Sequence, residues 1–433
     1  MRFKSMALGL GLALASASLL VACGGGGGSS STQVRLLNAS VGYPSLALNV
    51  DSTTATANVA YATAGAYTSV STSSSTTIQV QTSTGTTVAS TTPTLTGSSN
   101  YTLIAYGWAG ALKTTLLQET HDAPASGKSD LLVLNLAPDA GALDVYVTAP
   151  TDTLDNATAT ASAIAGGTSS GYLTNTAGTY RVRVTGAGSK TDLRLDIPSI
   201  TLDSAGTSTL LITPSQGGVL VNGIQVKQKG DATNLPNALS RVRVVAALNN
   251  NAKVSATVNG IPLLASATAP TIGDYATFAA GASTLTLGVN GAVVPVTAPT
   301  LAVGGDYTLL VWGDSSAPQL SVLSDDNRLP VTSGTVKLRL INGVANLGAN
   351  LAMTLDFTSV ASNVAPGASS TPAVVNSSTT SQLSVTSPTA VDPVFSIPTG
   401  SSSTPLTLVA NSVYTVFMMG DASLPRGQLK RER

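Results

Sequence analysis

The sequence predicts an all-β protein built from tandem β-sandwich domains, and two observations favour this class. Short apolar or alternating runs recur along the chain between turn residues, without helical periodicity. Hydrophobic residues make up 43% of the 433 residues whereas aromatic residues make up only 4%, and Ser, Thr, Gly and Val are abundant. This composition is typical of short strands joined by polar turns.

Residues 1–22 have the features of a bacterial lipoprotein signal peptide. Arg2 and Lys4 supply positive charge before an apolar stretch, residues 6–21, which is shorter than a membrane-spanning helix. The following motif, Leu20-Val-Ala-Cys23, resembles the lipobox of bacterial lipoproteins. This resemblance implies cleavage before Cys23 and acylation of its sulfur and amine. The alternative is an ordinary secretory signal that leaves Cys23 as a free thiol.

Residues 23–32 are predicted to form a flexible tether, because a run of glycines followed by serines buries no apolar surface. Gly24 is not the aspartate that commonly retains lipoproteins at the inner membrane. The lipoprotein resemblance therefore implies an outer-membrane location, with the leaflet left open. Acyl chains on Cys23 are sufficient for stable anchoring, so the membrane is the first predicted partner.

The composition excludes several function classes. Cys23 is the only cysteine, so the folded part has no disulfide and no thiolate metal site. The 21 basic residues balance 21 acidic residues, which leaves no electrostatic basis for binding nucleic acid. His121 is the only histidine, which removes most histidine-based catalytic and zinc sites. We interpret His121 as a solvated loop residue and expect no cofactor.

One unit, an apolar strand followed by a turn and an alternating strand, occurs four times. The second strands of successive units begin 97, 111 and 97 residues apart, at Leu46, Leu143, Val254 and Leu351. A period near one hundred residues predicts tandem domains, because solenoid repeats are much shorter. We therefore predict four β-sandwiches spanning residues 33–126, 127–237, 238–332 and a divergent 333–433.

A late strand marks three of the units and begins with Tyr101, Tyr307 or Tyr414. Successive residues along these strands are apolar, which predicts a central strand covered on both faces. A tyrosine in this place often bonds through its hydroxyl to nearby backbone in immunoglobulin folds, so we expect a structural role for it. Residues Thr358–Ser381 are rich in Ser, Thr, Ala and Pro, and we expect a long irregular loop there.

The segments Val34–Ser40 and Asn135–Val147 resemble the domain of unknown function 4397 family of bacterial envelope proteins. The acidic, proline-containing junctions at residues 118–128 and 323–335 resemble the connections between repeats of that family. Ala246 stands where the family pattern has asparagine. The resemblance implies repeated immunoglobulin-like sandwiches in secreted or lipid-anchored proteins, and it implies no activity.

Acidic clusters give little support for catalysis or metal binding. Asp325-Asp326-Asn327 is a candidate calcium site, but three residues do not supply the six to eight oxygens that calcium takes, and turn capping explains them equally well. Asp139 and Asp144 lack a second carboxylate at a suitable spacing, and we interpret both as turn residues. No nucleophile elbow or P-loop is present. We therefore predict that the protein is not an enzyme.

The predicted function is a structural or adhesion-like interaction array, anchored by lipid and projecting binding edges toward an envelope partner. The alternative is a protein that binds carbohydrate or another surface polymer, which requires exposed aromatic platforms. Tyr106, Trp108 and Trp312 are the candidates, although we expect them to pack in the core or between domains. The basic end, Arg426–Arg433, is interpreted as a solvated terminus that could touch anionic lipid or lipopolysaccharide.

Overall fold

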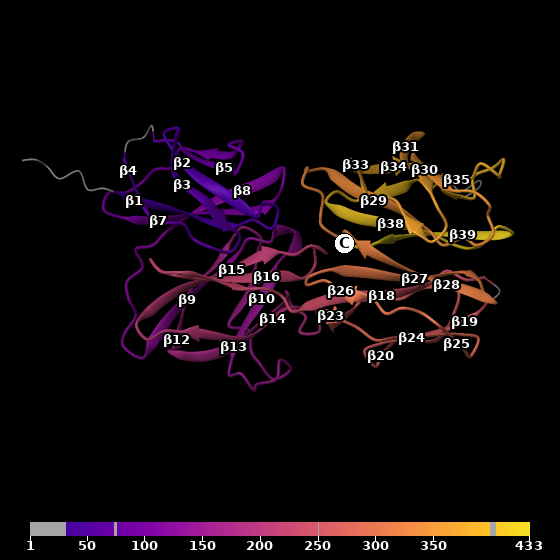
Figure 1. Cartoon of the computed structure of the whole chain (residues 1–433), viewed down its shortest axis with the longest axis horizontal. Coiled ribbons are helices and arrows are strands. Elements are labelled where there is room, and N and C mark those ends of the chain that lie inside the picture. The colour runs from indigo at the N-terminus through magenta and orange to yellow at the C-terminus, as the bar shows by residue number, and fades with distance from the viewer. Residues whose placement is uncertain (1–31, 73–75, 250, 399–403) are drawn as a thin grey trace, which may run out of the picture.

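The computed structural model describes residues 32–72, 76–249, 251–398 and 404–433. These residues form thirty-nine strands and one short helical turn, η1 (Pro138–Ala140), arranged as four β-sandwiches (Figure 1). The all-β prediction is confirmed. No helix in the described residues is long and apolar enough to cross a bilayer.

Domain 1 has two four-stranded sheets, β4-β1-β7-β8 and β3-β2-β5-β6. Its first strand pairs in parallel with the late strand β7, and this pair forms the centre of its sheet. The first strand begins at Thr32, which is fully buried and belongs to the sandwich rather than to the predicted tether. The strands are β1 (Thr32–Ala39), β2 (Ser45–Val50), β3 (Thr53–Ala60), β4 (Thr68–Val70), β5 (Ile78–Thr82), β6 (Thr87–Thr91), β7 (Asn100–Trp108) and β8 (Ala111–Gln118).

Domain 2 repeats the plan with sheets β12-β9-β15-β16-β17 and β11-β10-β13-β14, and β9 pairs in parallel with β15. The strands are β9 (Lys128–Asn135), β10 (Leu143–Thr148), β11 (Ala161–Ile164), β12 (Ser169–Thr176), β13 (Gly178–Gly186), β14 (Leu193–Leu202), β15 (Gly206–Pro214), β16 (Val221–Lys227) and β17 (Ala232–Leu235).

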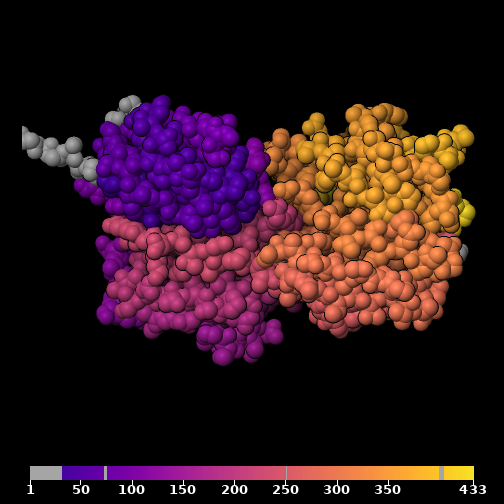
Figure 2. Space-filling model, viewed as in Figure 1, coloured from indigo at the N-terminus to yellow at the C-terminus, as the bar shows by residue number. Residues whose placement is uncertain are grey.

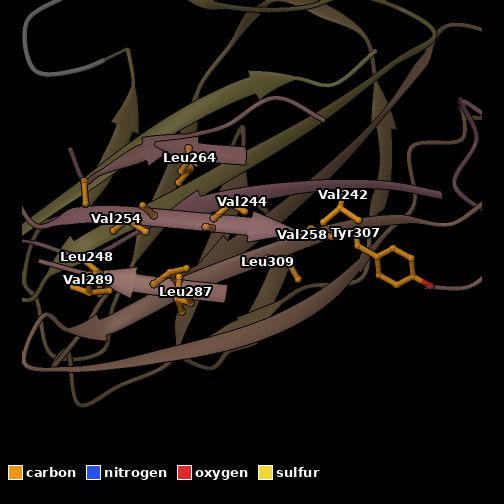
Figure 3. Close-up of a cluster of buried hydrophobic side chains, with 14 of the residues drawn as sticks. Val242, Val244, Leu248, Val254, Val258, Leu264, Leu287, Val289, Tyr307 and Leu309 are labelled. Atoms are coloured by element: carbon orange, nitrogen blue, oxygen red, sulfur yellow. The ribbon is translucent and has the colours of Figure 1, made fainter. Parts of the chain in front are cut away.

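Domain 3 has sheets β21-β18-β27-β28 and β20-β19-β24-β25, with β22 also paired to β18 and a small sheet β23-β26. Valines and leucines from the two main sheets meet in its core, with Tyr307 at one end (Figure 3). The strands are β18 (Leu239–Ala246), β19 (Lys253–Val258), β20 (Ile261–Thr268), β21 (Thr271–Ile272), β22 (Ala276–Ala279), β23 (Gly281–Ala282), β24 (Leu285–Val289), β25 (Ala292–Val294), β26 (Thr300–Leu301), β27 (Asp306–Asp314) and β28 (Ala317–Asp325).

Domain 4 has sheets β32-β29-β38-β39 and β31-β30-β35-β36, with β33 also paired to β29 and a small sheet β34-β37. The loop prediction for Thr358–Ser381 is wrong, because this segment forms four short strands whose backbone pairs with neighbours despite its polar composition. The strands are β29 (Thr335–Asn342), β30 (Leu351–Leu355), β31 (Thr358–Val364), β32 (Ala368–Ser369), β33 (Ala373–Asn376), β34 (Ser378–Ser381), β35 (Leu383–Thr386), β36 (Phe395–Ile397), β37 (Leu406–Leu408), β38 (Ser412–Asp421) and β39 (Leu424–Arg431).

The late strands are buried on both faces, as predicted. In domain 1, Leu103 of β7 points into the core of the sandwich, whereas its neighbour Ile104 joins a second apolar cluster. That second cluster includes Leu211 and Ile224 of domain 2. The central sheets of domains 1 and 2 therefore pack face to face and form the first pair of domains.

Domains 3 and 4 form a second pair in the same way. Leu310 of β27 lies in an apolar cluster with Ile341 and Phe417 of domain 4, and all three side chains are fully buried. Leu309 and Val416, one residue earlier along their strands, fill the cores of their own sandwiches. Each central sheet thus uses one face for its own core and the other face for a neighbouring domain.

Two arginines cross the interface between domains 3 and 4. Arg243 donates to both carboxylate oxygens of Glu432 at 2.8 Å, and Arg339 forms an ion pair with Asp325 at 2.7 Å. The Nε of each arginine also donates to a threonine of the neighbouring parallel strand, either Thr308 or Thr415. Each domain therefore supplies an arginine to the other domain's acid, and all four charged side chains are buried.

Domains 1 and 2 have one arginine–acid pair of this kind and not two. Arg35 bonds Thr102 and Glu119 within domain 1, both at 2.8 Å, and donates to the Gly230 carbonyl oxygen of domain 2 at 2.5 Å. In domain 2 the register places Leu132 beside Thr209, where the other domains have arginine. Gln228 follows β16 at the position of the acid. Domain 2 therefore lacks both the arginine and the acid of the charged pair.

The two pairs of domains meet end to end, so the molecule is a two-by-two block and not a string of domains (Figures 1 and 2). The turn after β15 enters the junction, where the Gly217 N–H donates to the Gly304 carbonyl oxygen at 2.8 Å. A Cβ at Gly218, where φ is +91°, would lie 2.4 Å from the Arg328 nitrogen. The faces of the sheets are therefore used to pack the domains together, an arrangement that the sequence left open.

The contribution of the buried Arg243–Glu432 pair to stability can be tested by introducing leucine and glutamine, the residue types that domain 2 has at these positions. Glu432→Gln is expected to cost about 3–5 kcal/mol of unfolding free energy, because it leaves Arg243 buried with reduced compensation. Adding Arg243→Leu to that variant is expected to recover at least half of the loss. Trp312 fluorescence during chemical denaturation, in a Trp108→Phe background, measures both effects. A double variant no more stable than Glu432→Gln alone would contradict the attribution of the lost stability to a buried Arg243 without its carboxylate partner.

Candidate functional site

A cleft of about 660 Å³ lies where the two pairs of domains meet. Its walls come from the β7–β8 hairpin of domain 1, the segment after β9 in domain 2, and the connection between domains 3 and 4. Ligand sites occur preferentially at such domain interfaces. The lining includes Tyr106, Trp108, Lys113, Pro138, Asp139 and Val331.

Trp108 is the last residue of β7 and lies next to the turn of the β7–β8 hairpin. The turn that follows it packs so closely on Gly42 that a Cβ there would meet the Ala109 nitrogen at 2.2 Å. The Arg328 guanidinium lies 4.4 Å from the centre of the indole ring, a favourable cation–π distance. Asp326 fixes Arg328 in turn, through an ion pair at 2.7 Å. The indole is therefore oriented by domain 1 and by the connection between domains 3 and 4 together.

Asp139 brings a buried carboxyl group to the cleft from η1. Its Oδ2 atom has no hydrogen-bond partner in the described part of the chain. Burial raises the pKa of Asp139, while the nearby Arg433 guanidinium and the Trp108 indole offset part of that rise. A buried acceptor without a donor is costly, so the surrounding contacts must offset the burial of this carboxyl group.

Further polar groups of the lining are also uncommitted. Within the described residues, the Tyr106 hydroxyl and the Lys113 ammonium make no hydrogen bond to protein. Burial raises the pKa of Tyr106, which keeps its hydroxyl protonated. Val331, 70% exposed, adds an apolar side chain on the opposite wall. The cleft therefore combines apolar surfaces with donors and an acceptor that have no internal partner.

Trp312 does not belong to this cleft. Its indole nitrogen donates to the Ser321 hydroxyl at 2.9 Å, and its ring packs against the apolar cluster between domains 3 and 4. Gly367 leaves room for it, because a Cβ there would lie 2.4 Å from the ring. The expectation of interdomain packing is confirmed for Trp312. Tyr106 and Trp108 also pack between domains, Trp108 through its contact with Arg328, and both reach the cleft as well.

The predicted calcium triplet uses its oxygens on other partners. Asp325 is buried and accepts hydrogen bonds from the Tyr275 and Thr308 hydroxyls at 2.5 and 2.6 Å. Asn327 donates to Asp306 at 2.8 Å. Burial would raise the pKa of Asp326, but hydrogen bonds from Arg328 and Lys337 lower it to about 2.

In the described residues no group of three or more His, Cys, Asp or Glu side chains has a geometry suited to a metal ion. Hydrogen bonds within domain 3 and ion pairs with Lys337 and Arg339 of domain 4 use the oxygens of the acidic triplet.

His121 lies in a loop, as predicted, but it is not simply solvated. Its ring stacks on Tyr172 at 3.6 Å, and Nε2 lies 2.8 Å from a carboxylate oxygen of Asp130. Gln228 donates to the His121 carbonyl oxygen at 2.8 Å. Hydrogen bonds from Thr174 and His121 lower the pKa of Asp130. These contacts fasten the connection between domains 1 and 2 to the surface of domain 2.

The tyrosines that begin the late strands have the predicted structural role. The hydroxyls of Tyr101, Tyr307 and Tyr414 accept hydrogen bonds from backbone N–H groups five residues earlier, at 3.0, 2.8 and 3.0 Å. Each therefore closes the turn that leads into its own strand.

Asp139 lies in the turn η1, as interpreted, and also lines the cleft. Asp144 lies in strand β10 and not in a turn, and its carboxylate accepts hydrogen bonds from the Ala163 and Gly188 backbone N–H groups. The solvated-terminus interpretation of residues 426–433 is wrong, because most of this segment is strand β39. The end of the chain lies at the centre of the molecule (Figure 1), where Arg433 donates to the Gly218 carbonyl oxygen at 2.5 Å.

Cys23, the predicted lipidation site, lies outside the described residues, as do the predicted signal peptide and all of the tether except Thr32. Sequence reasoning missed Lys113 as part of the cleft and Arg328 as the residue that stacks on Trp108, because nothing near either residue indicates which domain it will face. It also missed Phe357, an aromatic residue 89% exposed at the β30–β31 turn, where φ is +64°. The corresponding turn of domain 3 has Asn259-Gly260, the usual residues for this conformation.

A family model described as "Domain of unknown function (DUF4397)" matches residues 32–146 and 240–350, together more than half of the chain. The chain belongs to the DUF4397 family. Each DUF4397 match covers one odd-numbered domain and continues into the first strands of the next domain. The predicted family resemblance is therefore confirmed, with the family model occurring twice.

Comparison of this DUF4397 protein with curated proteins gives no significant match. Among solved structures it is similar to a "putative cell adhesion protein" from Bacteroides uniformis, with 12% identity over 71% of this chain and 98% of that chain and a TM-score of 0.15. A second protein of the same description, from Parabacteroides distasonis, shares 12% identity over 71% of this chain and 99% of that chain, with a TM-score of 0.17. These distant similarities carry no argument about the cleft.

Proposed function

We propose that this DUF4397 protein is a lipid-anchored protein of the bacterial outer membrane that acts by binding and not by catalysis. The observation that carries the proposal is the cleft between the two pairs of domains, which has walls from several domains held by buried interfaces. A site on a rigid block loses little entropy when it binds a ligand, because its walls are already ordered.

The absence of a catalytic constellation in the cleft supports the non-enzymatic part of the proposal. Asp139 is the only acidic residue in the described lining, so it lacks the second carboxylate of an acid–base pair. His121, the one histidine of the sequence, stacks on Tyr172 and contacts Asp130, and it is not part of the lining. The uncommitted groups of the cleft are suited to holding a ligand.

The envelope location rests on the sequence Leu20-Val-Ala-Cys23 and the short Gly/Ser segment after it. A Gly/Ser segment of this length is expected to keep the block close to the membrane surface. In the packed arrangement the cleft lies between the two pairs of domains, and β8 beside it remains an edge strand of its sheet.

The anchor is tested by metabolic labelling with a palmitate analogue. Wild-type protein is expected to incorporate the label and to sediment with outer membranes, and Cys23→Ala is expected to lose both properties because the acylated atom is gone. Cys23→Ser serves as a matched control that also removes the sulfur. Wild-type protein without label would contradict lipid anchoring.

The binding role is tested by retention of the full chain on isolated envelope material. Trp108→Ala is expected to reduce retention at least fivefold, because the indole forms part of the cleft wall. Phe357→Ala removes another exposed aromatic side chain outside the lining, and it is expected to bind like wild type. Equal retention of all three proteins, or no retention of wild type, would contradict a binding role for the cleft.

A further inference from the structure

We propose that the cleft between the two pairs of domains binds a short neutral carbohydrate chain. This inference rests on the proposed function, because it assigns a ligand class to the site named there. It depends on three properties of the lining: its apolar surfaces, its uncommitted polar atoms and its balance of charge.

The apolar surfaces suit the carbon-bearing faces of sugar rings. Trp108 and Tyr106 come from one strand, β7, two positions apart, so their side chains lie on the same side of the sheet. Pro138 and Val331 add aliphatic surface from two other segments of the lining. Aromatic rings with an apolar body and a polar atom are well suited to ligands that are part apolar and part polar. The Arg328 contact on Trp108 fixes the orientation of the indole before a ligand arrives.

The polar atoms require a ligand that both donates and accepts hydrogen bonds. The Asp139 carboxyl group belongs to the lining and is an acceptor when ionised. The Lys113 ammonium has only donors to offer, and the Tyr106 hydroxyl can act in either role. A purely apolar ligand would form hydrogen bonds with none of these groups. Hydroxyl groups meet all of these requirements at once.

The charges of the lining favour a neutral ligand over an anion. Lys113 and Asp139 bring one charge of each sign. Arg328, which stacks on the indole, is already paired with Asp326 at 2.7 Å. Arg433 lies near Asp139 and offsets its charge, but it is outside the lining and donates to the Gly218 carbonyl oxygen. A phosphate or an acidic polymer would face Asp139 without a free cluster of cations to compensate. A sugar chain without charged groups encounters no such repulsion.

An extended peptide is the competing occupant, because β8 is an edge strand and its first residues line the cleft. A peptide would bind by backbone pairing to that edge, and its affinity would depend little on the side chains of Asp139 or Lys113. The polar side chains that the lining places around Trp108 are therefore the observation that favours the carbohydrate.

The test is a screen of the purified full chain on an array of neutral and charged glycans, followed by calorimetric titration of those that bind. Neutral oligosaccharides are expected to bind, and Trp108→Ala is expected to weaken them at least tenfold. Lys113→Gln is expected to weaken them severalfold without affecting the fold, since this side chain makes no hydrogen bond to described residues. Phe357→Ala and Lys190→Gln, which change residues outside the lining, are expected to bind like wild type.

Two results would overturn the inference. Glycan binding that is unchanged by both Trp108→Ala and Lys113→Gln would place any sugar site elsewhere. Retention of envelope material that depends on Trp108 but is removed by protease, with no glycan bound, would identify a peptide occupant and leave the proposed function standing. Failure of the proposed function looks different, because wild type would then retain no envelope material at all.

Discussion

The structure depends on the parallel pairing of the first strand of each sandwich with its late strand. This pair, such as β1 with β7, occupies the middle of a sheet and is apolar on both faces. One face fills the sandwich, so the other face must be covered by something else. Here another domain of the same chain covers it, and for this reason four sandwiches that are separate in sequence form two tightly packed pairs.

Buried polar groups then determine which faces of the sheets pack against each other and how they are aligned. Domains 3 and 4 exchange an arginine and an acid across their interface, whereas domain 2 has Leu132 and Gln228 at the corresponding places. A buried charge without its partner is unfavourable, so the loss of both members together is the physically acceptable alternative. The end-to-end junction of the two pairs then leaves the cleft, whose walls belong to no single domain.

Much of the fold could be predicted from the sequence because it depends on local pattern. Alternation of apolar residues predicted the strands, the repeat spacing predicted four units, and the doubly apolar run at Leu309-Leu310 predicted a strand covered on both sides. The packing partner of that second face could not be predicted, since any apolar surface would satisfy it. Thr358–Ser381 was misjudged because backbone pairing forms strands there without an apolar signal. The cleft was not predictable either, because Trp108, Asp139 and Val331 come together only when all the domains have packed.

The central claim is that the four sandwiches form one compact block, and small-angle X-ray scattering of the non-lipidated Cys23→Ser chain tests it most directly. A compact chain of this size has a radius of gyration of about 22 Å, and the slightly elongated block is expected to lie close to that value. Four domains of the same size arranged as an open string would give about 40 Å. A value near the larger figure would contradict the packed pairs, and with them the cleft and the function proposed for it.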